Sequence, residues 1–363
     1  MRLLFLISDD CWNAKARAFV SAARGLAARG HETLIACESE CPVQARAAEA
    51  GVGVVSLDAN ASGAGDAMRL RRALNDRNVD VIFVHTDAEH LIASSAAKLG
   101  AGSAAVVRRI PPVTEIGSSR AGRFAARVTP SALLFTTEAD SQRAGAGRIA
   151  HGLAPLGIDV AEHDAVRGQT KATLGIPAAS TLVVCVNDGT NRARTLTALR
   201  VLSLLSPRHP ELHVAVIGAG ATDELRMHGA ALGVNAMVTY LGTRDDELSV
   251  LRAADVGWIA AEADAAAYAA LDFMAFRVPV LAERAPVTEH YIADGMNGVL
   301  LPLADAPTTA AAVASFLARA EQRVAMGNAG RARVEREFTL EPMLTGFESA
   351  AASVGQRLAR RVG

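Results

Sequence analysis

Short apolar runs alternate with helix-forming segments along this chain of 363 residues, and the pattern occurs twice. In the first half the runs have the length and continuous apolar character of strands covered on both faces: residues 3–7, 33–37, 52–57, 79–85, 104–109 and 132–136. Helix-forming residues fill the gaps, for example at 14–29, with Gly30 where a helix C-terminal glycine is expected. This alternation predicts an α/β domain with a parallel sheet and helices on both faces.

The second half repeats the pattern, with predicted strands at 182–186, 212–217, 236–240, 256–259, 279–282 and 298–301. Residues 155–175 carry charges without an apolar period and predict an irregular linker. We therefore predict two doubly wound, Rossmann-like domains, residues 1–160 and 161–338, facing each other across a cleft. Ligands of such sheets bind at the carboxyl ends of the strands, so this cleft is the expected site.

One more helix is predicted over residues 339–363, with Thr339 at its N-cap position. Apolar residues recur along it at steps of three and four: Leu344, Phe347, Ala351, Val354 and Leu358. Such a stripe must be buried, and we expect this helix to cross back and complete the N-terminal domain. Its last residues are basic, which suits either the helix dipole or contact with an anionic membrane surface: Arg357, Arg360 and Arg361.

Composition excludes several classes of protein. The chain has 37 Lys and Arg against 38 Asp and Glu, which argues against a nucleic-acid-binding protein. Its four cysteines form no paired metal-binding spacing and are too few for a disulfide framework. No apolar run approaches the roughly 20 residues of a membrane span, and the first residues lack the features of a signal peptide. We expect a cytoplasmic protein without a metal site, with association at a membrane surface as the open alternative.

Two carboxylates in the second half, Asp264 and Asp272, lie eight residues apart near a strand-to-helix turn. In a continuous helix this spacing corresponds to about 12 Å. A retaining glycosidase needs its two carboxyl groups about 5.5 Å apart, so the pair is not of that kind. The spacing suits two contacts on an extended ligand, or else two acidic residues favoured by a helix dipole.

The stretch 253–301 resembles the donor-binding segment of retaining glycosyltransferases of the GT-B fold, family 4. Their pattern is a glutamate, seven residues, a second glutamate, a short helix and Gly-x-Pro-Val. Asp264 and Asp272 fall on the two glutamates, and Pro279, Val280 and Glu289 match positions downstream. Further segments follow in the family's order: 29–32, 156–159, 217–220, 240–242, 253–255 and 294–298.

The resemblance implies roles for individual residues. Asp264 is expected near the hydroxyls of the transferred sugar and Asp272 on the nucleotide ribose. Arg192, with Arg194 nearby, is expected to hold the donor diphosphate, and Arg192 and Asp264 are the expected catalytic residues. Family members have an arginine where this chain has Asn187, so one of the two phosphate-binding cations is missing.

Other positions of the resemblance complete the expected donor site. Gly218 and Gly220 correspond to glycines that let the backbone approach the nucleotide. Thr243 and Arg244 lie in the loop similar to the one that lines the base, and Glu289 belongs to the downstream motif. Alanines replace the family's glycines at 265–267, and Arg277 and Val278 stand before the Pro-Val pair.

The resemblance implies metal-independent transfer, with retention of configuration, from a nucleotide-diphosphate sugar to an acceptor hydroxyl. The donor is then a co-substrate and no cofactor is expected; the acceptor is a sugar, a lipid-linked compound or a small molecule. The missing cation and glycines favour an alternative, a catalytically degenerate relative that serves as a binding or partner subunit. A nucleotide-dependent dehydrogenase is disfavoured because residues 8–13 contain no GxGxxG.

The acceptor is expected in the first domain. His85, Arg108 and Arg109 come at the ends of predicted strands, and Asn13 belongs to the first loop. Because carboxyl ends of parallel strands meet at one edge of the sheet, these residues are expected to be neighbours. Basic residues at helical steps form either a site for a phosphorylated or lipid-linked acceptor or a solvated face: Arg120, Arg123 and Arg127.

Overall fold

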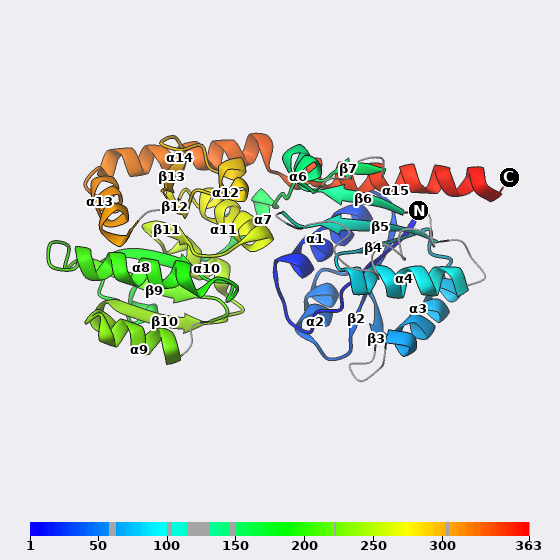
Figure 1. Ribbon diagram of the computed structural model, residues 1–363, viewed down its shortest axis with the longest axis horizontal. Helices are drawn as coiled ribbons and strands as arrows, with labels where there is room; N and C mark the ends of the chain where they lie inside the picture. Colours follow the sequence, from blue (N-terminus) through cyan, green and yellow to red (C-terminus); the bar gives the residue numbers. More distant parts are fainter. Residues whose placement is uncertain are drawn as a thin grey trace. The chain divides into compact units, whose positions relative to one another are not determined.

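The computed structural model describes residues 1–57, 63–99, 104–112, 114, 131–144, 150–220, 223–302 and 305–362. The chain forms two compact units (Figure 1). Unit 1 comprises Met1–Gly157 with Leu340–Gly363, and unit 2 comprises Ile158–Thr339. Each unit contains a parallel sheet flanked by helices, as the alternating pattern predicts.

The sheet of unit 1 has seven strands in the order β3-β2-β1-β4-β5-β6-β7. The strands are β1 Arg2–Leu6, β2 Glu32–Glu38, β3 Gly53–Leu57, β4 Val81–Val84, β5 Ala105–Ile110, β6 Ser131–Phe135 and β7 His151–Leu153. Its helices are α1 Ala14–Ala28, α2 Pro42–Glu49, α3 Gly63–Arg77, α4 Asp87–Leu99, α6 Glu138–Arg143 and α15 Leu340–Val362. The sequence does not predict β7, because its three residues form no apolar run.

The sheet of unit 2 has six strands in the order β10-β9-β8-β11-β12-β13. The strands are β8 Thr181–Val186, β9 Leu212–Ile217, β10 Val238–Gly242, β11 Val256–Ile259, β12 Val280–Glu283 and β13 Gly298–Leu301. Its helices are α7 Val160–Ala165, α8 Arg192–Leu205, α9 Asp223–Ala231, α10 Glu247–Arg252, α11 Ala263–Ala275, α12 Pro286–Tyr291, α13 Ala306–Leu317 and α14 Ala320–Glu337. Single 3₁₀ turns lie at Ala172–Leu174 and Asn235–Met237.

The prediction of an irregular linker over 155–175 is wrong, because α7 lies within it. Asp159 caps this helix by accepting hydrogen bonds from the backbone N–H groups of Ala161 and Glu162. Its buried residue is the polar His163, so an apolar period could not indicate it. Contacts with other helices of unit 2 hold α7 in place, as described below.

Helix α11 is buried along almost its whole length and packs directly on the sheet of unit 2. Gly257 in β11 makes this possible, since a Cβ atom there would lie 2.5 Å from the ring of Phe273. The helix ends in a Schellman motif, with Val278 N–H donating to the Phe273 carbonyl and Arg277 N–H to that of Met274. Arg277 takes the left-handed conformation usual for glycine, with φ of 59°.

Helix α15 belongs to unit 1, as its apolar stripe predicts; it is drawn in red in Figure 1. Leu344, Phe347, Ala351 and Val354 are all buried. The ring of Phe347 lies 5.1 Å from that of Phe83 in the sheet. At the helix surface Arg29 and Glu348 form an ion pair of 2.8 Å.

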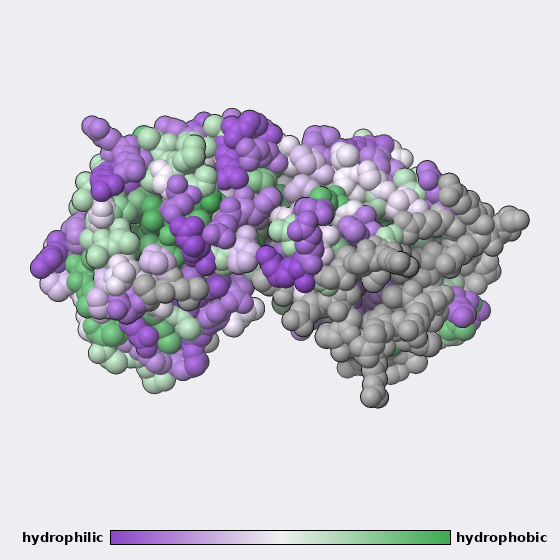
Figure 2. All heavy atoms as spheres, turned by 45° about the horizontal axis from the view of Figure 1, so that its top comes forward, coloured by the Kyte–Doolittle hydropathy of each residue, from purple (hydrophilic) through white to green (hydrophobic). Residues whose placement is uncertain are grey.

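On the surface of unit 2 turned to the viewer in Figure 2, hydrophilic and hydrophobic residues are interspersed. No helix in the described part of the chain is long and apolar enough to cross a membrane. The side chains of α15 beyond residue 356, including its three terminal arginines, lie outside the described residues.

Replacing Gly346 tests how closely α15 packs on the rest of unit 1. A Cβ atom at Gly346 would overlap the backbone of Leu153 and Ala154, whereas one at Gly355 on the same helix meets only the end of Met1 at 3.7 Å. We expect Gly346→Ala to lower the free energy of unfolding by about 1–3 kcal/mol. The matched Gly355→Ala should raise it by up to about 1 kcal/mol. Urea denaturation of both variants checks this; equal stabilities would contradict the packing described.

Candidate functional site

The donor-side residues of unit 2 lie where the strand order reverses. β8 is flanked by β9 and β11, and α8 begins at the carboxyl end of β8. The N-cap residue Asn191 does not cap α8 with its side chain; its Nδ2 donates instead to Oε1 of Glu262 at 2.7 Å. The first N–H groups of α8 are therefore not satisfied by their N-cap side chain, which is the arrangement that binds anions at helix N-termini.

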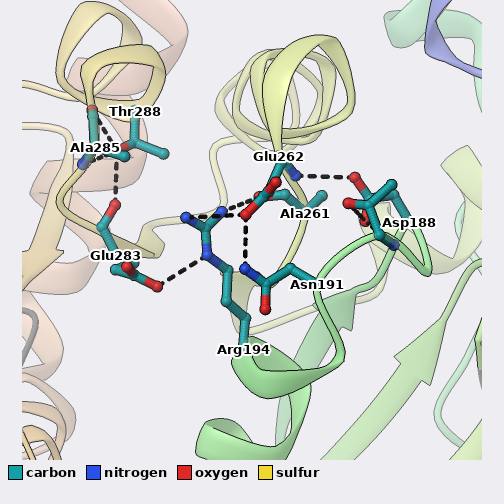
Figure 3. Close-up of polar contacts among 9 residues, drawn as sticks. Asp188, Asn191, Arg194, Ala261, Glu262, Glu283, Ala285 and Thr288 are labelled. Carbon is teal, nitrogen blue, oxygen red and sulfur yellow. Dashed lines mark hydrogen bonds and ion pairs between the residues drawn. The ribbon is translucent and has the colours of Figure 1, made fainter. Parts of the chain in front are cut away.

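Arg194 joins three loops at this edge of the sheet (Figure 3). Its Nε donates to Glu283 at 2.9 Å, and its Nη1 to the carbonyl oxygen of Ala261 at 2.8 Å. The backbone N–H of Glu262 in turn donates to Asp188 at 2.9 Å. Sequence reasoning missed Asp188, Glu262 and Glu283, although each is an acidic residue at or within three positions of the end of a predicted strand.

Arg192 stands in the first turn of α8 and is accessible. Its side chain is 54% exposed and forms an ion pair with Glu224 at the start of α9. Exposed pairs of this kind contribute only about 0–1 kcal/mol. Arg192 can therefore exchange Glu224 for a phosphate at little cost.

Asn187 is buried and turned into its own loop, where its Oδ1 accepts a hydrogen bond from Gly189 N–H at 2.9 Å. Gly218 and Gly220 have φ of 103° and 93° and lie against it. A Cβ atom on Gly218 would overlap the Asn187 carbonyl, and one on Gly220 would lie 3.0 Å from its Nδ2. The structure thus brings these three predicted residues together, with glycine required by close loop packing.

The remaining predicted donor residues lie on other loops at the surface of unit 2. Thr243 is exposed after β10, and next to it Arg244 binds Asp246 through two hydrogen bonds of 2.6 and 2.9 Å. The hydrogen bonds from Arg244 are the main cause that lowers the pKa of Asp246. Glu289 on α12 is exposed and accepts a hydrogen bond from Arg284 at 3.2 Å.

Asp264 lies in the first turn of α11 and is buried. A carboxylate there is stabilised by the positive end of the helix dipole. The preceding Ala263 adopts a left-handed conformation with φ of 45°, which costs a non-glycine residue about 1–2 kcal/mol. Backbone strain is thus concentrated beside the predicted catalytic carboxylate.

Asp272 is not placed as a carboxylate open to a nucleotide. Its Oδ1 lies 2.8 Å from Nε2 of His163, and the two side chains are only 5% and 2% exposed. The other ring nitrogen of His163 lies 2.7 Å from the carbonyl oxygen of Asp159. Both ring nitrogens therefore face oxygen acceptors, and the pair anchors α7 to α11.

Removing either partner of this pair should destabilise the protein. We expect His163→Phe and Asp272→Leu each to lower the free energy of unfolding by about 3 kcal/mol, because the buried polar group of the other residue loses this partner. The double variant should lose less than the sum, since one interaction is removed twice. Urea denaturation of the wild type, the two single variants and the double variant measures this coupling. His213→Phe is the matched control and should cost about 1 kcal/mol, because His213 faces only the Thr239 hydroxyl, at 2.8 Å; additive losses would contradict the pairing.

In unit 1 the strand order reverses between β1 and β4, and Glu89 joins their carboxyl ends. This buried carboxylate accepts hydrogen bonds from Ser8 N–H at 2.9 Å, Ser8 Oγ at 2.8 Å, His85 N–H at 2.7 Å and Thr86 N–H at 2.9 Å. The sequence did not single out Glu89, since it lies within a helix rather than at a strand end. Its position shows that the predicted acceptor edge is held by a satisfied carboxylate.

The predicted acceptor residues surround this point. His85 stacks on Phe19 with ring centroids 3.7 Å apart, and burial, followed by the charge of Arg109, holds its pKa well below the usual value. Arg108 donates to the His85 carbonyl at 3.1 Å and pairs with Asp87. Arg109 is fully buried and donates to Thr136 at 3.2 Å.

Asn13 lies in the loop after β1 and caps α1 by accepting a hydrogen bond from Ala16 N–H at 3.0 Å. It also donates to Asp9 at 2.7 Å, and Lys15 forms an ion pair of 2.8 Å with the same carboxylate. The Lys15 carbonyl lies 3.1 Å from Nε2 of His85, so the first turn of α1 contacts the residue that follows β4. The predicted basic stripe lies outside the described residues: Arg120, Arg123 and Arg127.

The buried histidines of unit 1 should make stability depend on pH. Burial lowers the pKa of His90 to about 4 from 6.5, so the folded form binds a proton less readily than the unfolded chain. The stability that depends on neutral His90 is fully present above pH 6.5 and is lost as the pH falls toward 4. The lowered pKa of His85 changes the stability in the same direction. We expect the lowered pKa of His90 to reduce the free energy of unfolding by roughly 2 kcal/mol between pH 6.5 and 5, with His85 adding a loss of the same sign.

Urea denaturation at several pH values, with the variant His90→Gln, measures this effect. The variant should show a shallower loss of stability in acid, whereas His151→Gln at an exposed position should keep the slope of the original protein. If the free energy of unfolding of His90→Gln falls with pH as steeply as that of the wild type, His90 is not the cause of the acid sensitivity.

Comparison with solved structures defines the class of fold. A glycosyltransferase from Rickettsia africae aligns over 97% of this chain and 98% of its own, with a TM-score of 0.81 and 14% identity. An Anabaena protein, HepE, in complex with UDP-glucose aligns over 100% and 99%, with a TM-score of 0.78 and 14% identity. At such identities the likeness establishes the fold, which is GT-B.

Two family models match in succession, a "glycosyl transferase 4-like domain" over residues 16–136 and "glycosyl transferases group 1" over residues 166–333. The chain belongs to these family-4-like glycosyltransferases of the GT-B fold. Among the described residues no group of three or more His, Cys, Asp or Glu side chains is arranged to hold a metal ion.

Curated relatives match at lower coverage. A D-inositol 3-phosphate glycosyltransferase of Corynebacterium kroppenstedtii is 26% identical over 45% of this chain and 39% of its own. The lipopolysaccharide core biosynthesis glycosyltransferase LpsE of Rhizobium meliloti is 24% identical over 50% and 53%. A D-inositol 3-phosphate glycosyltransferase of Mycolicibacterium vanbaalenii is 28% identical over 78% and 66%. The matches thus span from about two fifths to about two thirds of these relatives.

Proposed function

We propose that the chain transfers a sugar from a nucleotide-diphosphate sugar to an acceptor hydroxyl, with retention of configuration and without an obligatory metal. The observation that carries this proposal is the N-terminus of α8. Its N-cap side chain is turned away to Glu262, it presents the exposed Arg192, and the loop before it packs against Gly218 and Gly220. A diphosphate is the anion that this combination of N–H groups, arginine and closely approaching backbone suits.

The same geometry supports a catalytic role for Arg192. The bond to the sugar breaks as negative charge collects on the leaving diphosphate, so a cation and helix dipole at that point lower the barrier. Asp264, in the first turn of α11, would orient the sugar, and the loop with Thr243 and Arg244 would line the base. Glu289 would complete the donor site from α12.

The donor and acceptor classes follow from the comparisons and from unit 1. Solved neighbours include complexes with UDP and with UDP-glucose, which makes a UDP-sugar the first candidate donor. Three of the curated relatives are named D-inositol 3-phosphate glycosyltransferase, which makes an inositol phosphate the first candidate acceptor. An acceptor bound at this edge of unit 1 would lie near the Asn13 loop and His85, whereas Arg108 is paired with Asp87 and Arg109 is fully buried.

A second candidate function is that of a catalytically degenerate binding or partner subunit. Two observations favour it: Asn187 is turned into its loop, and the charge of Arg194 is met by Glu283 at 2.9 Å and Glu262 at 3.5 Å. Arg192 would then be the one arginine of the α8 turn left to bind the phosphates. Nucleotide binding and turnover distinguish the two candidates.

Thermal unfolding with UDP, GDP, ADP and TDP, and with their sugar conjugates, tests the proposal. A ligand at 100 times its Kd should add about 2.7 kcal/mol to the free energy of unfolding. Arg192→Ala should lose the shift with the nucleotide that binds, because the phosphate contact is removed. Arg200→Ala, an exposed arginine two turns along the same helix, is the matched control and should keep it.

The results separate the candidates. A shift with one nucleotide, together with release of that nucleotide in the presence of acceptors, supports the enzyme. Binding without release or sugar transfer supports the degenerate subunit. No shift with any nucleotide at millimolar concentration would overturn the proposed donor site.

A further inference from the structure

The N-cap residues of α8 and α11 bind each other instead of capping their own helices (Figure 3). Nδ2 of Asn191, the N-cap residue of α8, donates to Oε1 of Glu262, the N-cap residue of α11, at 2.7 Å. A carboxylate only accepts hydrogen bonds, so the Asn191 amide must keep its NH₂ group toward Glu262. Its carbonyl oxygen, the atom with which asparagine caps a helix, accepts no hydrogen bond from the first N–H groups of α8.

The Glu262 side chain has few other contacts. The Glu262 N–H donates to Asp188 at 2.9 Å, a hydrogen bond of the backbone that does not depend on the side chain. Arg194 lies 3.5 Å from the Glu262 carboxylate. It is bound more closely by Glu283 at 2.9 Å and by the Ala261 carbonyl at 2.8 Å. Because the Glu262 side chain is also 39% exposed, its removal leaves the loop in place and chiefly releases the N-cap side chain of α8.

A buried hydroxyl lies at the same end of α8. Thr195, four positions after Asn191, is fully buried, and its Oγ1 finds no hydrogen-bond partner in the described part of the chain. Residues four apart share one face of a helix, and their side chains lean toward its N-terminus. The Thr195 hydroxyl therefore leans toward the helix end that Asn191 leaves uncapped. Buried polar groups almost always have partners, so this hydroxyl favours a ligand at that end.

We propose that Glu262 is a positioning residue, which keeps the N-terminus of α8 open to the donor diphosphate by holding the amide of Asn191. This inference rests on the proposed function, in which that helix end binds the diphosphate. A released Asn191 side chain would compete with the phosphate oxygens for the same N–H groups. By its charge alone a carboxylate beside an anion site weakens binding, whereas Glu262 acts in the opposite direction.

Calorimetry with UDP, GDP, ADP and TDP measures the effect on Kd. For a nucleotide that binds the wild type, Glu262→Ala should raise the Kd about fivefold, because Asn191 then competes for the N–H groups of α8. Glu224→Ala is the matched control, since it removes an equal charge, the partner of the exposed Arg192, while Asn191 stays on Glu262. The Kd of this control should not rise, because Arg192 loses a competing carboxylate.

Two further variants separate positioning from charge and from general damage to the loop. Glu262→Gln removes the charge but keeps an oxygen that accepts from Asn191, so its Kd should stay within about twofold of the wild type. Glu262→Ala combined with Asn191→Ala leaves no side chain to cap α8, and it should regain the wild-type Kd to within about twofold. Damage to the loop would not be repaired by removing a second side chain.

The outcomes test the inference and the proposed function separately. Binding by Glu262→Ala that is as tight as that of the wild type, or tighter, would overturn the inference. A double variant that binds as weakly as Glu262→Ala would also overturn it. Glu262→Ser, which is too short to reach Asn191 and can cap α11, gives the same test if Glu262→Ala does not fold. No binding of any of the four nucleotides by the wild type would instead overturn the proposed function.

Discussion

The close packing of α11 on its surroundings is the constraint on which unit 2 depends. Glycine at 257 lets the helix approach β11, and glycine at 330 lets α14 approach it from another side, since a Cβ atom there would lie 3.0 Å from Met274. The His163–Asp272 pair ties α7 to the same helix. With both flanks and its C-terminal half fixed, α11 presents Asp264 at a defined point beside the carboxyl ends of the strands.

In both units a charged side chain holds together the loops at the carboxyl ends of the strands. Parallel strands bring several loops to one edge, and the loops need polar partners to hold them. Unit 2 uses Arg194, which binds Glu283 and the backbone of Ala261. Unit 1 uses a carboxylate, Glu89, with four donors around it. These residues position loops, whereas Arg192 in unit 2 keeps an exposed side chain.

The positions in the fold that could be predicted were those tied to regular elements. Asp264 and Arg192 lie in the first turns of helices, and Gly218 and Gly220 follow a strand, so their places follow from apolar periodicity; their roles at a donor site stay predictions. His163 was missed because its helix has no apolar stripe and is held by partners distant in the chain. The burial of Asp272 was missed for the same reason: the motif specifies its place on α11 but not its partner. Asn187 was recognised as a departure, yet its hydrogen bond to Gly189 depends on local loop geometry.

The sequence by itself determined the two α/β units, most strand positions, the return of α15 to unit 1 and membership of the glycosyltransferase family. These features depend on local periodicity and on the order of motifs, both of which are properties of the chain read in one dimension. Only the tertiary structure decided which charged side chains are exposed to solvent and which are buried and paired with other residues of the protein. Burial and pairing, as between His163 and Asp272, arise between residues 109 positions apart, and no local pattern encodes them.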